Sequence, residues 1–467
     1  MTASSLKFGT SGLRGLALDL EGQAARRYTA AFLAHLVQLG LDGGGRVFLG
    51  RDFRSSSVAI VADCAAAIAA AGLEPVDCGL LPTPALALHA MAAGCAAIMV
   101  TGSHIPADRN GLKFYLPSGE ISKADEAGII AALSESEVPD WHGAVADEAE
   151  AASQRYFDRF AAMLPEGALA GLRIGVFEHS TVARDLLTDI LRHHGADTVS
   201  LGRIDGFVPI DTEAFGDAVL APLSGWIAEH GLDAVVSADG DGDRPLLMDG
   251  AGQFVRGDVL GLLTARFLGA GVVVTPVTSN SAIERTGFFA EVVRTRVGSP
   301  YVVAGMETST GSVIGFEANG GTFVGVGVSA VGSSLPPLPT RDAVLPLLCV
   351  LALAAGEGKS VAATVSALPL QCALSDRLQD VPSERSAAFL GRLATDEHYS
   401  RTLFAKHGIA SLTQIDGLQF RTMSGDMVHF RASGNAPELR CYVEGSTPEA
   451  ASDLLAWGLS VALREVQ

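Results

Sequence analysis

The chain has 467 residues, of which 48% are hydrophobic, and its formal net charge is −19. This composition can bury a large core, and the acidic balance argues against nucleic acid or an anionic membrane as a partner, because both are bound through clusters of Lys and Arg. The six cysteines lie far apart with no CxxC pair, which favours reduced thiols in a cytoplasmic protein over a disulfide framework or a zinc site.

Three blocks of the chain repeat one order of elements, in which each of three strand-like runs is separated from the next by a helical pattern. The first strands are predicted at 46–50, 172–177 and 271–277. The second strands are predicted at 74–79, 197–202 and 290–298, and the third strands at 96–100, 233–237 and 312–316. Hairpin-like runs follow the first two of these third strands. The apolar stretch 345–355 is shorter than the roughly 20 residues that span a bilayer, and it predicts a buried helix.

This alternation predicts an α/β protein with three similar βαβαβ domains, whose sheets are mixed but largely parallel. After about residue 370 the pattern changes to a smaller C-terminal α+β domain that ends in a helix up to Gln467. The predicted bounds of the four domains are 1–150, 151–254, 255–368 and 369–467.

Each third strand runs into an unusual polar loop, with the sequences TGSHIP, ADGDGDRP and EANGG in chain order. Parallel sheets place ligands at the carboxyl ends of their strands. Three such loops at equivalent positions therefore predict one site that is assembled between the domains.

The second of these loops carries Asp239, Asp241 and Asp243 in alternation, which puts three carboxylates on one side of an extended backbone. Hard oxygen ligands suit Mg²⁺, which leaves coordination positions for water or phosphate. An EF-hand would need Gly and Glu where Arg244 and Gly250 stand, so a calcium loop of that kind is excluded. A solvated acidic turn is the structural alternative.

The first loop places Ser103 between Gly102 and His104. A hydrolase nucleophile is disfavoured, because Ile105 replaces the second Gly of a G-x-S-x-G elbow and a His next in sequence ordinarily projects away from the serine. A serine that carries a phosphoryl group would need a nearby cation, which the acidic loop could supply. A serine that merely caps a turn is the other interpretation.

Lys113, ten residues after Ser103, has apolar neighbours in the run GLKFY. Partial burial could adapt its amine to proton transfer, although a lysine that only extends from a strand end to solvent is as common. The segment RASGNAPELR offers guanidinium, hydroxyl, amide and backbone N–H groups that suit a phosphate monoester, or that only build a turn. These groups belong to Arg431, Ser433, Gly434, Asn435 and Arg440.

Five motifs, FGTSGLRG, TGSHIPADRNGLKFY, DGDGDRP, EANGG and RASGNAPELR, occur in this order and at these distances. With them the chain resembles the α-D-phosphohexomutase family, which includes phosphomannomutases, phosphoglucomutases and phosphoglucosamine mutases. The resemblance spans residues 8 to about 445, and within the family the chain is most similar to bacterial phosphomannomutases. It implies four domains around a central cleft, which are, in chain order, a phosphoserine-loop domain, a metal-binding domain, a sugar-binding domain and a phosphate-binding domain.

The resemblance also implies a role for individual residues. Ser103 would be the active phosphoserine, with His104 beside it in the catalytic set. The catalytic set would also include Lys113 as general acid/base and Arg14, which assists phosphoryl transfer. The implied ligands of Mg²⁺ are the seryl phosphate on Ser103, Asp239, Asp241 and Asp243. The implied substrate-binding residues are Arg244 beside the metal, Glu317 and Asn319 for the sugar, and Arg431, Ser433, Gly434 and Asn435 for the phosphate.

Departures from the family pattern concern the sugar more than the reaction. The serine loop reads TGSHIP where TASHNP is usual, and EANGG replaces ESGH-like forms, so that Asn319 stands where a serine is usual. Ser299 stands where members acting on both mannose and glucose have a His. Gly434 and Asn435 also differ from the familiar phosphate loop.

The sequence therefore predicts a reversible mutase that interconverts hexose 6-phosphate and hexose 1-phosphate through a phosphoserine and a hexose 1,6-bisphosphate, which also serves as activator. Mannose is the favoured sugar, with glucose and glucosamine as alternatives. A metal-dependent sugar phosphatase and a non-catalytic sugar-phosphate binding protein are the alternatives from other classes. A small-molecule sugar phosphate is the predicted partner, with no nucleic acid or membrane, and the sequence leaves protein partners open.

Overall fold

A computed structural model describes residues 4–9, 12–41, 43–213, 217–330, 333–434 and 437–466. The chain forms two compact units. The first consists of Met1–Val274, Phe289–Glu291 and Gly298–Ala367, and the second of Thr275–Phe288, Val292–Val297 and Leu368–Gln467. The predicted four-domain division stays a prediction.

The first block of the chain forms a sheet with the order β1-β2-β6-β5-β3-β4-β8, with β7 beside β6. Its strands are β1 (Lys7–Phe8), β2 (Leu13–Leu16), β3 (Arg46–Arg51), β4 (Glu74–Leu80), β5 (Ala96–Val100), β6 (Arg109–Leu116), β7 (Gly119–Glu120) and β8 (Ala146–Asp147). Its helices are α1 (Ala17–Leu20), α2 (Gln23–Gln38), the short 3₁₀ turn η1 (Gly43–Gly45), α3 (Ser57–Ala70), α4 (Thr83–Ala92) and α5 (Lys123–Ala131).

The second block forms a sheet with the order β10-β9-β11-β12. Its strands are β9 (Arg173–Phe177), β10 (Asp197–Leu201), β11 (Ala234–Ala238) and β12 (Pro245–Asp249). Its helices are α6 (Ala149–Ala161), α7 (Arg184–His193) and α8 (Asp217–His230).

The third block forms a sheet with the order β14-β13-β15-β16-β19 and a small hairpin of β17 and β18. Its strands are β13 (Val272–Pro276), β14 (Glu291–Thr295), β15 (Val313–Phe316), β16 (Thr322–Val324), β17 (Ser329–Ala330), β18 (Ser333–Ser334) and β19 (Leu338–Asp342). Its helices are α9 (Gly257–Phe267), α10 (Ala282–Arg285), α11 (Ser299–Glu307), α12 (Val344–Gly356) and α13 (Val361–Ser366).

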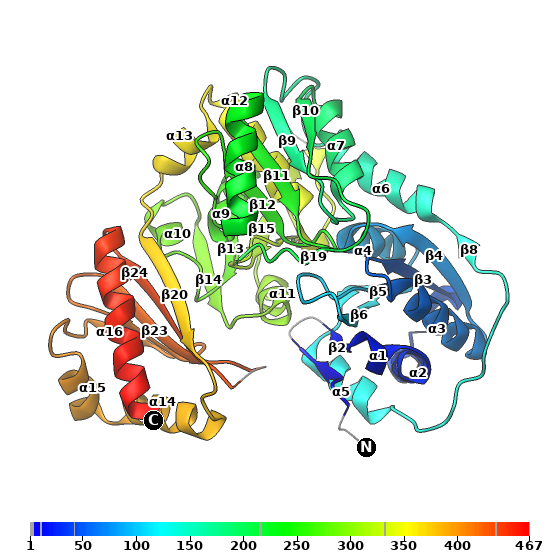
Figure 1. Ribbon diagram of the computed structural model, residues 1–467, viewed down its shortest axis with the longest axis horizontal. Coiled ribbons are helices and arrows are strands. Elements are labelled where there is room, and N and C mark those ends of the chain that lie inside the picture. The colour runs from blue at the N-terminus through cyan, green and yellow to red at the C-terminus, as the bar shows by residue number, and fades with distance from the viewer. Residues whose placement is uncertain are drawn as a thin grey trace. The chain divides into compact units, whose positions relative to one another are not determined.

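The three blocks share one strand order, which confirms the predicted fold class (Figure 1). In each block the first strand lies between the second and the third, and the fourth strand pairs with the third in antiparallel fashion. The first and third strands of every block run parallel. All residues of β5, β11 and β13 are buried, as expected of parallel strands whose two faces are covered by helices.

Helix α12 contains the apolar stretch 345–355 and confirms the prediction of a buried helix. It packs against α9 and β12.

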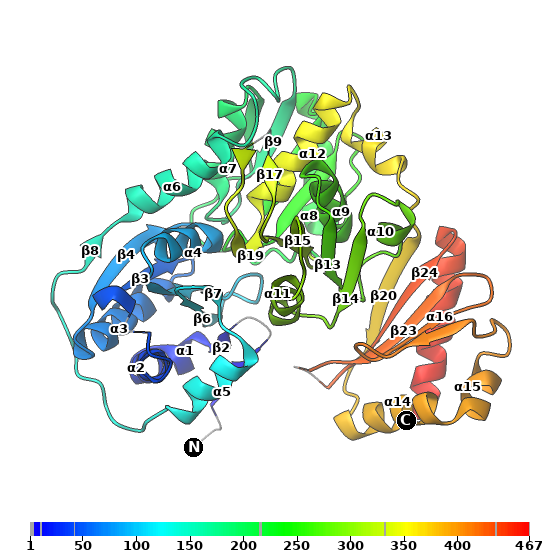
Figure 2. The same cartoon turned by 180° about the vertical axis from the view of Figure 1, so that it is seen from behind.

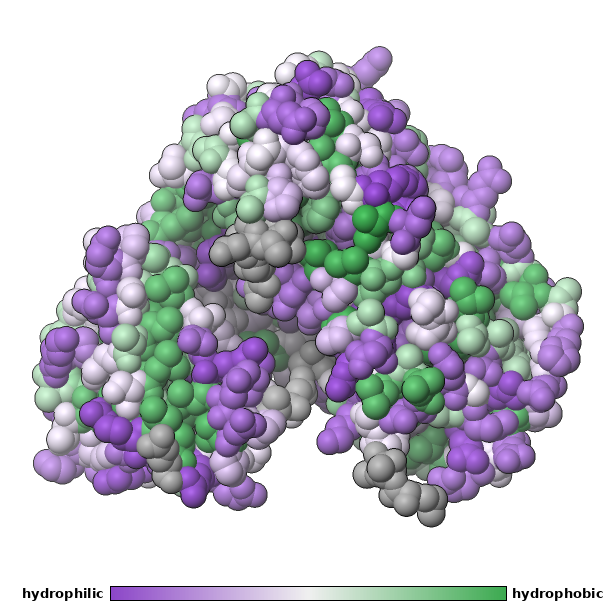
Figure 3. All heavy atoms as spheres, in the orientation of Figure 1, coloured by the Kyte–Doolittle hydropathy of each residue, from purple (hydrophilic) through white to green (hydrophobic). Residues whose placement is uncertain are grey.

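No helix among the described residues is long and apolar enough to cross a membrane. On the face drawn in Figure 3, most hydrophobic residues are scattered among hydrophilic ones, apart from a continuous column of hydrophobic residues at the left of the view.

The second unit contains an antiparallel sheet with the order β20-β24-β23-β22-β21. Helix α16 lies along this sheet and contacts β20 and β24 (Figures 1 and 2). Its strands are β20 (Cys372–Leu378), β21 (Ser411–Thr413), β22 (Leu418–Arg421), β23 (Met427–Ala432) and β24 (Leu439–Gly445), and its helices are α14 (Ser383–Thr395), α15 (Glu397–Leu403) and α16 (Pro448–Val466). The predicted change to an α+β pattern after about residue 370 is confirmed.

Gly257 at the start of α9 touches the loop after β15 so closely that no side chain fits. A Cβ at this position would lie 2.3 Å from the carbonyl carbon of Asn319 and 2.3 Å from the amide nitrogen of Gly320. We expect Gly257→Ala to lower the free energy of unfolding by about 1 to 3 kcal/mol, because backbone must move to relieve the overlap. Chemical denaturation measures this loss.

Gly225→Ala in α8 is the matched control, because a Cβ there meets nothing within 4 Å. The better helix propensity of Ala should leave this variant as stable as the wild type or slightly more so. Equal stability of the two variants would contradict the close approach of α9 to the loop after β15.

Candidate active site

Two of the predicted loops meet at the carboxyl ends of β5 and β11. The hydroxyl of Ser103 donates a very short hydrogen bond to Asp239. Thr83 at the start of α4 donates its hydroxyl proton to Asp241 Oδ2 over 2.6 Å. The first and second blocks therefore share one site, as predicted from the positions of their loops.

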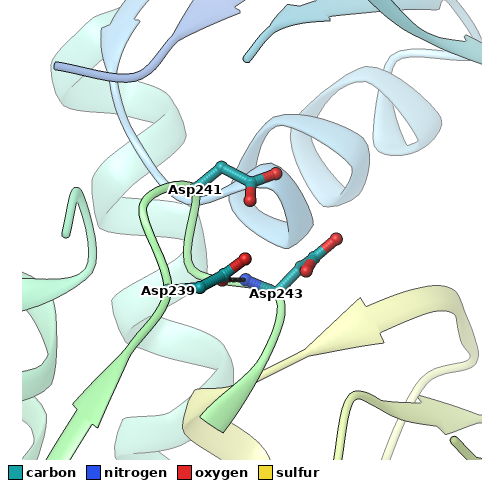
Figure 4. Close-up of side chains that lie close together, drawn as sticks. All are labelled: Asp239, Asp241 and Asp243. Carbon is teal, nitrogen blue, oxygen red and sulfur yellow. Dashed lines mark hydrogen bonds between the residues drawn. The ribbon is translucent and has the colours of Figure 1, made fainter. Parts of the chain in front are cut away.

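The three aspartates form a buried cluster in which one oxygen from each carboxylate lies within 4.8 Å of the others. Figure 4 shows that the three side chains point to the same side of the loop, as the alternation predicted. Burial and the charges of Asp241 and Asp243 raise the pKa of Asp239 well above its usual value. Burial also opposes ionisation of Asp243, but the charges of Arg341, Lys113 and Arg244 outweigh it and lower the pKa of Asp243.

The donor set fits a divalent cation. Asp241 Oδ1 and Asp243 Oδ1 are buried and accept no hydrogen bond, so two carboxylate oxygens are available as ligands. Buried acceptors without a partner are costly unless something positive binds them. Together with the hard oxygen character of all three groups, this favours a cation of the Mg²⁺ type.

Ser103 has a left-handed backbone conformation with φ of 53°, which is uncommon for a residue other than Gly. Its amide donates to Thr101 Oγ1 over 2.7 Å, and its carbonyl accepts from Arg54 Nη2 over 3.0 Å. Arg54 is buried and also donates to the carbonyl oxygens of Ile105 and Pro106. This one guanidinium therefore fixes the loop that carries the serine.

Arg54 is a residue that sequence reasoning missed. It also pairs with buried Asp52 and lies with its guanidinium carbon 3.9 Å from the ring centroid of Phe207. The available signal was the segment DFRSS directly after β3, because β3 ends at the same edge of the sheet as β5.

Lys113 on β6 lies at the cluster of three aspartates. Its Nζ is 2.5 Å from both Asp241 Oδ2 and Asp243 Oδ2, and its side chain is 5% exposed. Burial lowers the pKa of this amine, but the charges of Asp241 and Asp243 outweigh burial and raise it. The alternative of a lysine that extends to solvent is therefore excluded.

His104 lies beside the serine, with Nδ1 3.2 Å from Ser103 Oγ. The expectation that this ring projects away from the serine is wrong, because the left-handed backbone at Ser103 turns the following residue toward the same side. Burial, followed by the charges of Arg244 and Arg14, lowers the pKa of His104 far below its usual value. The ring is therefore neutral at physiological pH.

Two of the predicted arginines add positive charge to the site. Burial, and after it the charges of Arg244 and Arg341, lower the pKa of Arg14 on β2 to about 10. Arg244 donates its backbone amide to Asp239 Oδ1 over 3.1 Å, and its side chain pairs with Glu213 at 3.2 Å. Arg244 thus lies beside the acidic cluster, as the family resemblance implied.

The third loop, after β15, also joins the site. Glu317 Oε2 accepts hydrogen bonds from Arg341 Nη1 over 2.8 Å and from Ser299 Oγ over 3.2 Å. Asn319 is buried, and its Oδ1 accepts from the amide of Gly321 over 3.0 Å, so part of this side chain shapes the loop. Arg341, which lies between this loop and the acidic cluster, is a second residue that sequence reasoning missed.

The predicted phosphate loop belongs to the second unit. Arg431 on β23 pairs with Asp416 at 2.7 Å, and the amide of Ser433 donates to the carbonyl of Glu438 over 2.9 Å. Gly434 ends a described range, and Asn435 lies outside the described residues. Phosphate binding by this loop stays a prediction.

The arrangement unites a serine hydroxyl, a cation site and several positive side chains around one point. Such a site can neutralise the charge of a phosphoryl group while it moves to or from an oxygen nucleophile.

The sequence model of phosphoglucomutase/phosphomannomutase alpha/beta/alpha domain I matches residues 5–139, and that of domain III matches residues 256–371. A phosphomannomutase of Sinorhizobium fredii is 49% identical, over 97% of this chain and 98% of its own length. A phosphomannomutase of Salmonella muenchen is 41% identical, over 98% and 95%. The chain belongs to the phosphoglucomutase/phosphomannomutase family. As a member it is an isomerase of the intramolecular phosphotransferase type.

Solved structures of this family agree with the fold. A putative phosphomannomutase from Thermus thermophilus is 25% identical with a TM-score of 0.76, and the match covers 99% of both chains. A family protein from Burkholderia thailandensis has a TM-score of 0.79 at 20% identity, over 98% of this chain and 97% of its own. The resemblance that the five motifs predicted is confirmed.

Replacing one carboxylate of the cluster should weaken cation binding. We expect Asp241→Asn to raise the dissociation constant for Mg²⁺ at least about tenfold, because affinity in oxygen-ligand sites depends on the number of charged ligands. Isothermal titration calorimetry on the purified protein measures this constant without any turnover.

Asp233→Asn is the matched control, because Asp233 is exposed and lies just before β11, at the other end of that strand from the cluster. Its Mg²⁺ affinity should equal that of the wild type. If Asp241→Asn bound Mg²⁺ as tightly as this control, the acidic loop would not be the cation site.

Proposed function

We propose that the protein is a phosphohexomutase that interconverts hexose 6-phosphate and hexose 1-phosphate, with mannose phosphate as its preferred substrate. The observation that carries this proposal is the hydrogen bond between Ser103 and Asp239. It puts the proposed phosphoryl carrier directly against a cluster of carboxylates that fits Mg²⁺. A phosphoserine without a nearby cation would be repelled by these same carboxylates.

In the proposed reaction, phosphorylated Ser103 donates its phosphoryl group to the free hydroxyl of a hexose monophosphate. The bond between the serine oxygen and phosphorus breaks, a bond between phosphorus and the sugar oxygen forms, and a hexose 1,6-bisphosphate results. The bisphosphate then turns over and returns its other phosphoryl group to Ser103. Added hexose 1,6-bisphosphate would act as an activator, because it phosphorylates any enzyme that has lost the phosphate.

The ligands of Mg²⁺ would be Asp239, Asp241, Asp243 and the seryl phosphate. The ion would neutralise their charge together with that of the transferred phosphoryl group. An ion bound to the three aspartates would offset the charges that raise the pKa of Lys113, so that burial and the charge of Arg341, both of which lower this pKa, would remain. Lys113 would then accept the proton of the sugar hydroxyl and return it in the reverse step.

The remaining predicted residues would bind and orient the substrate. Arg14 and Arg244 supply positive charge next to the serine, where negative charge accumulates during transfer. Glu317 would accept hydrogen bonds from sugar hydroxyls, with Asn319 beside it in the loop. The phosphate that is not transferred would bind to the loop of Arg431, Ser433, Gly434 and Asn435.

Mannose is proposed because relatives named phosphomannomutase are 49% and 41% identical to this chain over nearly its full length. A phosphoglucosamine mutase of Acidothermus cellulolyticus is 31% identical over 94% of this chain. Glucosamine phosphate is therefore the second candidate substrate, and glucose phosphate the third.

A substrate panel tests the proposed function. Mannose, glucose and glucosamine 1-phosphates are supplied with Mg²⁺ and a trace of hexose 1,6-bisphosphate, and formation of the 6-phosphates is followed together with release of inorganic phosphate. We expect the highest kcat/KM for mannose 1-phosphate and almost no free phosphate. Phosphate release without isomerised sugar would instead identify a sugar phosphatase.

Loss of the serine nucleophile should abolish transfer. We expect Ser103→Ala to lower mutase activity by several orders of magnitude, as removal of a covalent nucleophile does. Intact mass spectrometry should show a phosphorylated fraction in the wild type after incubation with the bisphosphate, and none in this variant. Ser118→Ala, which changes an exposed serine in the turn between β6 and β7, should keep both activity and phosphate. Near wild-type turnover by Ser103→Ala would refute the phosphoserine mechanism.

A further inference from the structure

Arg341 lies near the end of β19, next to the loop after β15. β19 pairs with β16, where Asp342 is the partner of Thr322, so Arg341 is carried to the start of β16 and the EANGG loop. The residue is 2% exposed. A guanidinium at this depth has to be paired on all sides to be tolerated.

The contacts of Arg341 join two parts of the active site. Nε and Nη2 donate to Asp243 Oδ2 over 3.2 and 2.7 Å, and Nη1 donates to Glu317 Oε2 over 2.8 Å. Nη1 also makes a very short hydrogen bond to Ser299 Oγ, which in turn donates to Glu317. One rigid, planar group therefore connects the proposed cation site with the proposed sugar site.

Arg341 contacts one oxygen of the Asp243 carboxylate and one oxygen of the Glu317 carboxylate. Asp243 Oδ2 takes the hydrogen bonds of Arg341 and Lys113, whereas Asp243 Oδ1 accepts none and stays available for a cation. Glu317 is held by Oε2 in the same way. Arg341 thus sets the orientation of a cation ligand and of a sugar ligand at once.

Gly321 provides the space for this arginine. A Cβ at position 321 would lie 2.5 to 2.9 Å from the Cβ, Cγ and Cδ atoms of Arg341. The backbone of Gly321 is not in the left-handed region that favours glycine, so the packed stem of Arg341 is the reason that no side chain fits here.

We propose that Arg341 is a positioning residue that couples Mg²⁺ binding at Asp243 to sugar-phosphate binding at Glu317, with Gly321 as the space it requires. The proposal rests on the proposed function, since it assumes that a hexose phosphate binds at Glu317. Mg²⁺ at Asp243 and a sugar hydroxyl at Glu317 would each stabilise the orientation of the guanidinium that the other ligand needs, so each ligand would favour the other.

The test measures binding rather than turnover. In a Ser103→Ala background, where no phosphoryl transfer occurs, the dissociation constant for Mg²⁺ is measured by calorimetry with and without saturating mannose 1-phosphate. We expect the sugar phosphate to tighten Mg²⁺ binding when Arg341 is present. Arg341→Lys keeps the charge but loses the fork of donors, so it should remove this coupling and weaken Mg²⁺ binding alone by about ten- to a hundredfold.

Gly321→Ala provides a second variant that removes no polar group and keeps Arg341. The added methyl group should push the arginine stem aside and reduce the coupling in the same direction. Arg26→Lys is the matched control, because Arg26 is a largely buried arginine paired with Asp63 at 2.9 Å in the first block. It should leave the coupling and the Mg²⁺ affinity unchanged.

Undiminished coupling and Mg²⁺ affinity in folded Arg341→Lys, or in Gly321→Ala, would overturn the proposal. A loss of thermal stability without any change in coupling would likewise show that Arg341 only holds the fold together. If the wild type bound and converted no hexose phosphate, the proposed function would fail instead. The Mg²⁺ affinity of Arg341→Lys without sugar would then still decide whether Arg341 orients Asp243.

Discussion

The structure depends on the balance of charge around three buried aspartates. Asp239, Asp241 and Asp243 repel one another away from water, and the pKa of Asp239 rises for that reason. Lys113 and Arg341 offset this repulsion through direct ion pairs. Lys113 lies on β6 and Arg341 on β19, so strands from two other blocks contact the loop after β11. The network that compensates the carboxylates is thereby also the network that assembles the site.

The repeated strand order explains why the site lies where it does. In each block the third strand lies beside the first and ends in a polar loop, so one architectural position is used three times for three chemistries. In the proposed function, the loops after β5, β11 and β15 would supply a nucleophile, a cation site and a hydroxyl acceptor in turn. A repeated fold with divergent loops can thus build an asymmetric site from equivalent parts.

The sequence predicted the parts of the fold that depend on local pattern. Short apolar runs bounded by polar loops located β3, β5, β9, β11 and β15, and the alternation of the aspartates predicted that their carboxylates share one side. Arg54 and Arg341 were missed because each acts on a loop far from it in sequence, and neither stands in a recognisable motif. The orientation of His104 depends on the left-handed backbone at Ser103. A serine does not predict this conformation, because Gly or Asn is its usual sequence signal.

The second compact unit is discontinuous along the chain. Its strand β24 holds the segment Thr275–Phe288 through Glu444, which accepts the backbone amide of Ser281 over 2.8 Å. Asp416 similarly accepts the amide of Val297 over 3.0 Å. During synthesis these segments leave the ribosome well before their partners, which lie more than a hundred residues later. This unit must therefore complete its fold after translation of the C-terminal region. A fragment that begins at the predicted boundary of residue 369 would lack the two earlier segments, Thr275–Phe288 and Val292–Val297, that belong to this unit.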